Sequence, residues 1–332
     1  MDPETWSTPG WRHTATVWLD TRLAEAGLRR TGFVEQPHLR PWATALRAPT
    51  TGGDVWLKAA GPATASEVGV YEALLDAAPH NVLEPLALDP ARAWMLLPDG
   101  GRPLGERSSG DGVVEAMITV LPAYAELQRA LAPQADRLVD GGTRDMRPVA
   151  MAARIDEALV AVEAVAGNGT DHAALQRVAE HRDVVVGWCA ELAAAPGPPT
   201  LDHHDLHPWN VVVADDEPVQ QARFYDWGDS VVAHPFSSML VALTFAQRRL
   251  GVSEHRTDRM RDAYLEPFTD LASHQELVAT MELACRVGKV ARALTWARVV
   301  AAMDPGPDRD EWARAAVATL TSVVDESYLG GA

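Results

Sequence analysis

The densest group of residues that could do chemistry spans positions 202–210, Asp-His-His-Asp-Leu-His-Pro-Trp-Asn. A second acidic group, Asp-Trp-Gly-Asp, begins at Asp226, sixteen residues after Asn210. Two short strand-like runs joined by a turn at 215–218 predict a hairpin between these groups, which brings Asn210 and Asp226 to one point in space. An amide oxygen and a carboxylate are hard ligands suited to magnesium, which keeps further sites for water and phosphate.

Asp205 lies five residues before Asn210 on the same loop and is expected to face this metal. Its carboxylate can accept a proton from a hydroxyl group. Phosphoryl transfer needs this combination, because its catalysis rests mainly on positioning and on neutralising charge. The spacing therefore indicates phosphotransferase chemistry.

The histidines of this loop allow a competing interpretation. His203, His204, Asp205 and His207 resemble the His-x-His-x-Asp-His ligand run of dinuclear zinc hydrolases. However, two adjacent histidines point their side chains apart, and no second histidine cluster with supporting carboxylates follows. Packing of the loop, or contact with an acceptor, better suits His204 and His207.

The elements that must position these residues begin with short β-favouring runs at 42–48 and 54–58, joined by the turn residues of 49–53, so Lys58 ends a strand. A helix is expected from Ser66 onward, and two further strands at 86–88 and 94–97.

A turn-rich break at 98–103 separates this small mixed part from a mostly helical one. Apolar residues recur at three and four positions in many later segments. We expect an α+β fold with an N-terminal lobe at 1–98, a hinge at about 95–101 and a helical C-terminal lobe at 99–332. Helices are predicted at 15–28, 113–127, 149–166, 172–194, 236–250, 255–267, 274–302 and 309–327.

The motif His203-x-Asp205-Leu206-x-x-x-Asn210, followed by Asp226-Trp227-Gly228-Asp229, resembles the catalytic loop and metal motif of the aminoglycoside phosphotransferase family of small-molecule kinases. The resemblance spans roughly residues 36–240, and the earlier elements follow in the same order. It implies a two-lobed, protein-kinase-like fold. A protein kinase proper is disfavoured, because Trp-Gly rather than Phe-Gly follows Asp226 and no Ala-Pro-Glu segment is present.

Carried over position by position, the resemblance implies that Asp205 is the catalytic base or hydroxyl-orienting group. Asn210 and Asp226 are implied to bind Mg²⁺, and His203 to brace the loop. Lys58 is implied to contact the phosphates of a nucleotide, ATP or GTP, and to pair with a carboxylate on the following helix.

Two glutamates on that helix, Glu67 and Glu72, could pair with Lys58. Glu67 shares a helix face with the apolar residues three, four and seven positions later, whereas Glu72 points away. We therefore expect Glu67 to be the partner.

The remaining nucleotide contacts are less well marked. Residues 36–48 contain no Gly-x-Gly-x-x-Gly loop, so Thr44 is the candidate for a hydroxyl that contacts phosphate, as loops with Ser or Thr do in the family. Met95 and Leu97, in the segment between the lobes, are expected to line the nucleotide site.

Composition limits the class of protein. The 332 residues carry a net charge of −17, which argues against a nucleic-acid partner, and 47% hydrophobic with 23% charged residues is typical of globular proteins. No apolar run approaches about 18 residues, and the first residues are acidic and polar, so we expect a soluble, cytoplasmic protein without a membrane partner. Cys189 and Cys285 indicate neither a disulfide framework nor a zinc site.

The charge is unevenly distributed. Residues 1–98 have 8 basic and 11 acidic groups, net −3, which leaves 21 and 35, net −14, for residues 99–332. This acidity is either an ordinary solvated surface or a means of attracting a cation. With the resemblance, it favours a small cationic acceptor such as an aminoglycoside or an amino sugar, and the acids at Glu266, Asp270, Glu276 and Glu282 are candidates to bind it.

The function expected is transfer of the γ-phosphate of ATP or GTP to a hydroxyl of that acceptor. Choline-like, homoserine-like and neutral sugar acceptors occur in the same family, and antibiotic resistance is one role among several. The rival from another class is a non-catalytic binding protein that keeps the kinase fold.

Overall fold

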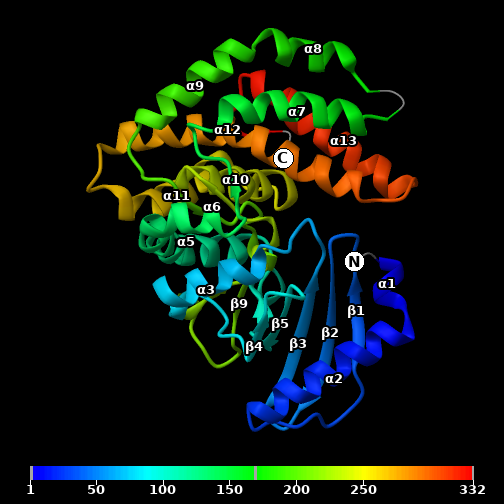
Figure 1. Ribbon diagram of the computed structural model, residues 1–332. Coiled ribbons are helices and arrows are strands. Elements are labelled where there is room, and N and C mark those ends of the chain that lie inside the picture. Colours follow the sequence, from blue (N-terminus) through cyan, green and yellow to red (C-terminus); the bar gives the residue numbers. More distant parts are fainter. Residues whose placement is uncertain (1–2, 168–169, 331–332) are drawn as a thin grey trace.

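The computed structural model describes residues 3–167 and 170–330. Its N-terminal part is built on one antiparallel sheet with the strand order β1-β2-β3-β5-β4 (Figure 1). The strands are β1 (Glu35–Leu39), β2 (Ala43–Thr50), β3 (Gly53–Ala60), β4 (Ala87–Asp89) and β5 (Trp94–Pro98). The predicted hairpin is confirmed as β2 and β3, and the predicted strand pair is β4 and β5.

The two faces of this sheet have different partners, because successive residues of a strand point to opposite sides. Leu57 and Leu96 are direct neighbours on one face, where they join a buried cluster with helix α2 (Pro9–Glu25). Lys58 and Met95 are direct neighbours on the other face, and Met95 belongs to the core of the helical part. Lys58 is therefore turned towards the rest of the molecule.

Helix α2 covers the first face of the sheet (Figure 1). Its buried residues recur every four positions, at Trp11, Ala15, Leu19 and Leu23. The helix was expected at 15–28, but it begins earlier, because Thr8 accepts a hydrogen bond from the Trp11 amide at its N-terminus. The short α1 (Pro3–Ser7) precedes it.

Helix α3 (Glu67–Ala77) lies on the second face, next to α5 (Asp111–Leu131) (Figure 1). Val70, Tyr71 and Leu74 are buried together with Glu67, whereas Glu72 is exposed. The helix face expected to point inward is confirmed.

The second part of the chain is mainly helical. Its other helices are α4 (Leu104–Arg107), α6 (Ala135–Asp140), α7 (Met151–Val165), α8 (His172–Glu180), α9 (Arg182–Ala194), α10 (Met239–Arg249), α11 (Glu254–Leu265), α12 (His274–Ala301) and α13 (Pro307–Thr321). The segment predicted as one helix at 172–194 forms α8 and α9, which meet at His181. Helices α7 and α13 both pack against the long α12 (Figure 1).

Two small sheets lie among these helices. One has the order β10-β9-β6 and joins β6 (Arg102–Pro103), β9 (Val211–Val213) and β10 (Arg223–Phe224). The other has the order β7-β11-β8 and joins β7 (Arg144–Asp145), β8 (Thr200–Asp202) and β11 (Val231–Ala233). The second sheet was not expected, because segments of two or three residues carry no periodic pattern.

Within the part of the chain that the structure describes, no helix combines the length and the apolar character needed to cross a membrane. Cys189 and Cys285 are both buried and free.

Candidate active site

The β9–β10 hairpin brings the two polar groups together as expected. Val211 is paired with Phe224, and the Tyr225 amide donates a hydrogen bond of 3.2 Å to the Asn210 carbonyl. Asn210 therefore lies beside the residue that immediately precedes Asp226. Each polar residue is held by backbone pairing at the end of a strand.

Lys58 connects the N-terminal sheet to this hairpin. Its Nζ lies 2.7 Å from Oε1 of Glu67 and 2.5 Å from Oδ1 of Asp226. The Glu67 side chain is fully buried, whereas the Asp226 side chain is half exposed. The three residues come from β3, from α3 and from the segment after β10, so this contact joins the two parts of the fold.

The pKa values of these groups reflect burial and mutual attraction. Burial raises the pKa of Glu67 to about 6, although Lys58 opposes the shift. Burial would lower the pKa of Lys58, but Asp226 and Glu67 outweigh it and raise this pKa above its ordinary value. Burial would likewise raise the pKa of Asp226, yet Lys58 keeps it below its usual range. Lys58 and Asp226 are therefore both charged at neutral pH.

Asp226 has a left-handed backbone, with φ of 63° and ψ of 59°. This conformation is uncommon outside glycine, although aspartate tolerates it better than most residues. It turns the chain from β10 into a short turn at Trp227–Asp229 and aims the Asp226 carboxylate at Lys58.

Asp205 and Asn210 are in direct contact. Nδ2 of Asn210 donates hydrogen bonds to the Asp205 carbonyl at 2.9 Å and to its Oδ2 at 3.3 Å. Nε2 of His207 lies 3.5 Å from the same Oδ2. Because its nitrogen faces Asp205, the amide oxygen of Asn210 points away from Asp205.

Arg292 is a member of the site that the sequence analysis missed. Its Nη2 donates a hydrogen bond of 2.8 Å to Oδ1 of Asp205, and its Nη1 one of 2.8 Å to the His204 carbonyl. The same Nη1 lies 3.3 Å from Oδ2 of Asp229. Arg292 is only 4% exposed. A sequence signal existed, since it is a single cation in the apolar run Val290-Ala291-Arg292-Ala293-Leu294.

Arg292 dominates the electrostatics of Asp205. Burial alone would raise the pKa of this carboxyl, but Arg292 and, with smaller effects, His207 and His203 lower it below its ordinary value. Asp205 is therefore anionic at neutral pH and ready to accept a hydrogen bond on Oδ2.

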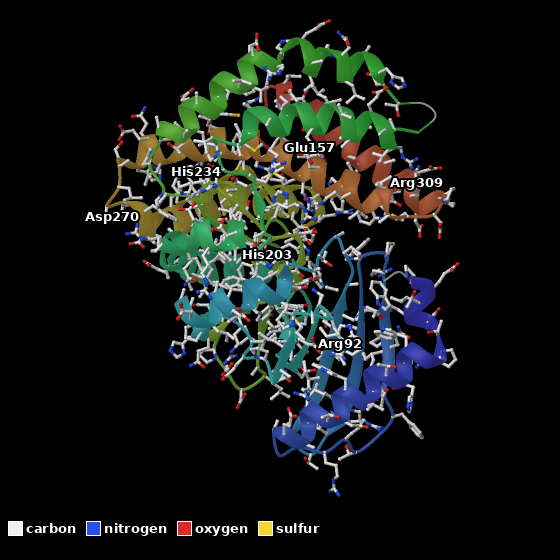
Figure 2. All side chains as sticks on the ribbon, in the orientation of Figure 1. Arg92, Glu157, His203, His234, Asp270 and Arg309 are labelled. Carbon is white, nitrogen blue, oxygen red and sulfur yellow. The ribbon has the colours of Figure 1, made fainter. Side chains whose placement is uncertain are left out.

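His203 connects the loop at 202–210 to Tyr225, Trp227 and Tyr124. Its Nε2 donates a hydrogen bond of 2.9 Å to the Tyr225 carbonyl, and its ring packs 4.6 Å from the ring of Trp227. Its backbone amide donates to the hydroxyl of Tyr124 at 3.0 Å. Figure 2 shows His203 near the centre of the molecule, close to where the sheet part meets the helical part. Burial lowers the pKa of His203, so its neutral form is favoured.

A buried network continues this support. The Tyr124 and Ser238 hydroxyls are 2.8 Å apart, and the Ser238 hydroxyl donates to Oδ1 of Asp202 at 2.5 Å. The same oxygen accepts a hydrogen bond of 2.8 Å from the His204 amide. Tyr124 lies in the helix predicted at 113–127, but the sequence does not show these partners, because they are distant in the chain.

The residues expected to contact the nucleotide lie in two different places. Met95 and Leu97 are buried on the Lys58 face of β5. Thr44 does not join them. Its hydroxyl donates to the His38 carbonyl at 2.8 Å and accepts from Nε2 of Gln36 at 2.9 Å. Thr44 is 1% exposed, so its hydroxyl holds the β1–β2 pair together instead of facing a ligand.

The donor set of Asn210 and Asp226 fits magnesium. Mg²⁺ is commonly held by one or two protein oxygens, with the remaining sites taken by water and phosphate. Zinc fits poorly, since His203 faces Tyr225 while His207 faces Asp205. Among residues 3–167 and 170–330, no three His, Cys, Asp or Glu side chains are grouped to hold a metal.

The acids proposed to bind a cationic acceptor lie elsewhere. Asp270 is exposed and paired with Arg129 at 2.8 Å, and Glu276 caps the start of α12. The helix rise places Glu276 ~24 Å from Arg292 along α12. Figure 2 shows Asp270 at the edge of the helical part, away from His203. Glu266 and Glu282 are also exposed.

The fold is shared with solved small-molecule kinases. It is similar to a choline/ethanolamine kinase family protein from Mesorhizobium loti, with a TM-score of 0.60, 17% identity and coverage of 94% of this chain and 95% of that chain. It is also similar to a macrolide 2'-phosphotransferase from Brachybacterium faecium, with a TM-score of 0.56 and 18% identity; the match covers 91% of this chain and 97% of that chain. A third similar structure is Plasmodium vivax ethanolamine kinase, with a TM-score of 0.61 and 10% identity; the match covers 96% of this chain and 90% of that chain. These likenesses show a protein-kinase-like α+β fold.

No curated protein matches the sequence. The family model described as the phosphotransferase enzyme family matches residues 50–277, which is more than half of the chain. The matched range includes Lys58, Asp205, Asn210 and Asp226. The chain therefore belongs to the phosphotransferase enzyme family, and it is a phosphotransferase that uses an alcohol group as its acceptor.

Proposed function

We propose that this phosphotransferase is a kinase that transfers the γ-phosphate of ATP or GTP to a hydroxyl of a small molecule. The observation that carries the proposal is the convergence of Lys58, Asp205, Asn210 and Asp226, drawn from distant parts of the chain. Residues 1–98 would bind the nucleotide, and residues 99–332 would supply the catalytic loop and the acceptor site.

Each of these residues has a distinct task. Lys58, held by Glu67, contacts the nucleotide's phosphates, and Met95 with Leu97 lines the site of its base. Asn210 and Asp226 would hold Mg²⁺, which would neutralise charge on the transferring phosphate. The Asp226 carboxylate is half exposed, so it would be accessible to such a cation.

Asp205 acts on the acceptor. The acceptor hydroxyl donates a hydrogen bond to Oδ2, which orients its oxygen towards the γ-phosphorus. A bond forms between this oxygen and phosphorus, the bond from phosphorus to the bridging oxygen breaks, and the nucleoside diphosphate leaves. The hydroxyl proton passes to Asp205. Since its pKa is depressed, orientation is a larger part of its role than strong basicity.

The net charge of residues 99–332 and the charges close to Asp205 favour different acceptors. The net −14 of residues 99–332 favours long-range attraction of a cationic acceptor, such as an aminoglycoside or an amino sugar. The groups within contact distance of Asp205 include the cation Arg292, however, and contact distances govern recognition.

The test combines nucleotide binding with turnover. Binding of ATP and GTP is measured by calorimetry with and without Mg²⁺, and diphosphate release is measured with aminoglycosides, amino sugars, amino alcohols, neutral sugars and hydroxy acids. We expect magnesium-dependent binding and acceptor-dependent release. The variant Asp205→Asn should bind nucleotide like the wild type and lose turnover at least about a hundredfold.

Two outcomes would contradict the proposal. Full turnover in Asp205→Asn would remove this residue from the mechanism. Absence of magnesium-dependent nucleotide binding in the wild type would favour a non-catalytic protein with a kinase fold.

A further inference from the structure

Arg292 contacts the oxygen of Asp205 that Asn210 does not contact. The two oxygens of the Asp205 carboxylate have different neighbours, since Oδ1 accepts from Arg292 while Oδ2 accepts from Asn210. Arg292 therefore holds the carboxylate by Oδ1 and lies next to the group that is proposed to orient the acceptor hydroxyl through Oδ2. Its guanidinium also lies 4.1 Å from the centre of the Trp296 ring, one turn further along α12.

Arg298 brings a second cation to this region. Side chains of a helix tilt towards its N-terminus, so the Arg298 guanidinium lies over the preceding turn. There its Nη2 donates a hydrogen bond of 3.0 Å to the hydroxyl of Thr295, a residue three positions from Arg292. Nε of Arg298 is buried and has no hydrogen-bond partner among the described residues.

Arg144 brings a third cation from a different element. It is paired with Val231 in the β7–β11 ladder, and Asp229 lies two residues before Val231. Its Nη2 donates a hydrogen bond of 2.8 Å to the Ala63 carbonyl in the loop between β3 and α3. Burial lowers the pKa of both Arg144 and Arg298, whereas the charge of Asp229 raises it, and Asp229 itself forms an ion pair with Arg292. We call Arg144, Arg292 and Arg298 the arginine cluster.

Two of the three guanidinium groups in the arginine cluster are not paired with a carboxylate of the described residues. Arg292 takes Asp205 and Asp229, whereas Arg144 and Arg298 have no carboxylate within 4.0 Å in the described ranges 3–167 and 170–330. Glu157, the other acid that attracts both, pairs with Arg154 at 2.6 Å.

Both arginines nevertheless stay charged. Burial, with a smaller effect of Arg144, lowers the pKa of Arg298 to about 9, which is still above neutral pH. A partly buried cation without an anion costs free energy that a bound anion would offset.

We propose that the arginine cluster receives an anionic group of the acceptor, a carboxylate or a phosphate, so that the kinase acts on a hydroxylated anion and not on a polycation. This inference rests on the proposed function, because it assumes that an acceptor hydroxyl reaches Asp205. Arginine suits the role, since its planar guanidinium binds two oxygens of such a group at once. Arg298 and Arg144 are specificity-determining residues in this assignment.

The neighbouring surface suggests which carrier of the anion to test. The rings of Trp296 and Trp312 lie 4.7 Å apart at 30°, and Trp42 of the N-terminal part meets Trp312 edge to face at 6.1 Å. The three rings are only partly buried, so part of their apolar area is exposed near Arg292. An acceptor with a planar body and an anionic group would use both this area and the arginine cluster.

The experiment compares acceptors of one skeleton and three charges. The first set is 4-(hydroxymethyl)benzoate with its amide and with 4-(hydroxymethyl)benzylamine, and the second is glucuronate with glucose and glucosamine. Binding to the wild type is measured by calorimetry with Mg²⁺, both with and without a non-hydrolysable ATP analogue. Turnover is measured by ADP release with ATP.

We expect the anionic member of at least one set to bind roughly tenfold or more tightly than its neutral and cationic counterparts, because charge-assisted hydrogen bonds supply that difference. Arg298→Gln should remove this preference, while the affinity for the ATP analogue stays unchanged. Arg144→Gln should reduce it as well. The matched control is Arg314→Gln, which removes the same charge from an exposed position on α13 and should keep the preference.

Several results would overturn the inference. These are a preference for the neutral or cationic member, the absence of any preference for the anion, or a preference that survives in Arg298→Gln. Anion binding that disappears when the ATP analogue is present would instead assign the arginine cluster to the nucleotide's γ-phosphate.

A separate measurement shows whether the proposed kinase function itself fails. Binding of the ATP analogue is measured first, with and without Mg²⁺ and without any acceptor. If that binding is absent, the proposed function fails. If it is present and the anion preference is absent, only the inference about the acceptor fails. Circular dichroism of each variant confirms that a lost preference does not reflect a lost fold.

Discussion

Arg292 donates a 2.8 Å hydrogen bond to Asp205 across 87 positions of the chain. The contact joins the long helix α12 to the polar loop at 202–210. It holds one carboxylate oxygen of Asp205 in place and leaves the other beside Asn210. The orientation of the proposed catalytic residue therefore depends on a helix that contributes nothing to the loop itself.

The pair should show strong coupling in a double-mutant cycle. Arg292→Met leaves Asp205 buried without its cation, and Asp205→Asn leaves Arg292 with one carboxylate fewer. We expect each change to destabilise the protein, and the double variant to be more stable than additivity predicts by about 1–3 kcal/mol. Urea unfolding of the four proteins measures this coupling, and simple additivity would show that the contact contributes little.

Lys58 should matter for the nucleotide more than for the acceptor. Lys58→Met removes the cation that Glu67 and Asp226 share. We expect the dissociation constant of magnesium ATP to rise about tenfold or more, because a charge-assisted contact to phosphate is lost. Glu67→Gln keeps a hydrogen-bond acceptor for Lys58 and should cause a smaller loss. Calorimetry distinguishes the two, and equal losses would argue against an indirect role for Glu67.

Gly101, in the segment that leads from β5 to β6, should not tolerate a side chain. Its φ is 88°, and a Cβ there would lie 2.4 Å from the Val213 carbonyl oxygen. We expect Gly101→Ala to reduce the free energy of unfolding by roughly 2–4 kcal/mol. Gly142→Ala is the matched control, since Gly142 has φ of 95° with open space around it. Similar losses in both variants would mean that backbone strain alone, without the clash, accounts for the effect.

His234 should make stability depend on acidity. Its Nε2 donates to the Pro196 carbonyl at 3.1 Å, its Nδ1 accepts from the Phe236 amide at 3.3 Å, and burial lowers its pKa to about 4. Protonation is easier in the unfolded chain, where the pKa is near 6.5. The contribution of His234 is therefore complete above about pH 6.5 and is lost as the pH falls towards 4.

Between pH 7 and pH 5 this group should cost about 2 kcal/mol of stability. His234→Gln removes the titrating ring, so its free energy of unfolding should fall less over the same interval, although the variant is less stable at pH 7. Urea unfolding at both pH values gives the two slopes. Equal slopes would show that other groups control the acid sensitivity.

Local sequence patterns were sufficient for several features of this protein. The hairpin of β2 and β3 follows from β-favouring runs around a turn, and the inward face of Glu67 follows from the helix period. The polar loop before Asn210 and the acidic group at Asp226 are visible because polar residues crowd where a core segment would be apolar. In each case the information lies within about 25 residues of the chain.

Tertiary structure alone decided the rest. Thr44 was a candidate ligand by position, but the pairing of β1 with β2 directs its hydroxyl to the His38 carbonyl. Arg292 stands out in its apolar run, yet only the packing of α12 shows that Asp205 is its partner. The three strands of the β7-β11-β8 sheet are too short to have a period of their own, so their pairing comes from long-range contacts.

The acceptor side shows the same division. Net charge is a property of the sequence, and at −14 for residues 99–332 it pointed to a cation. The arginine cluster is assembled from β7 and α12 and reverses that expectation locally. The physical reason is that electrostatic and hydrogen-bonding energies depend on distances of a few ångströms, which only the folded chain determines, whereas periodicity and composition are written along the chain itself.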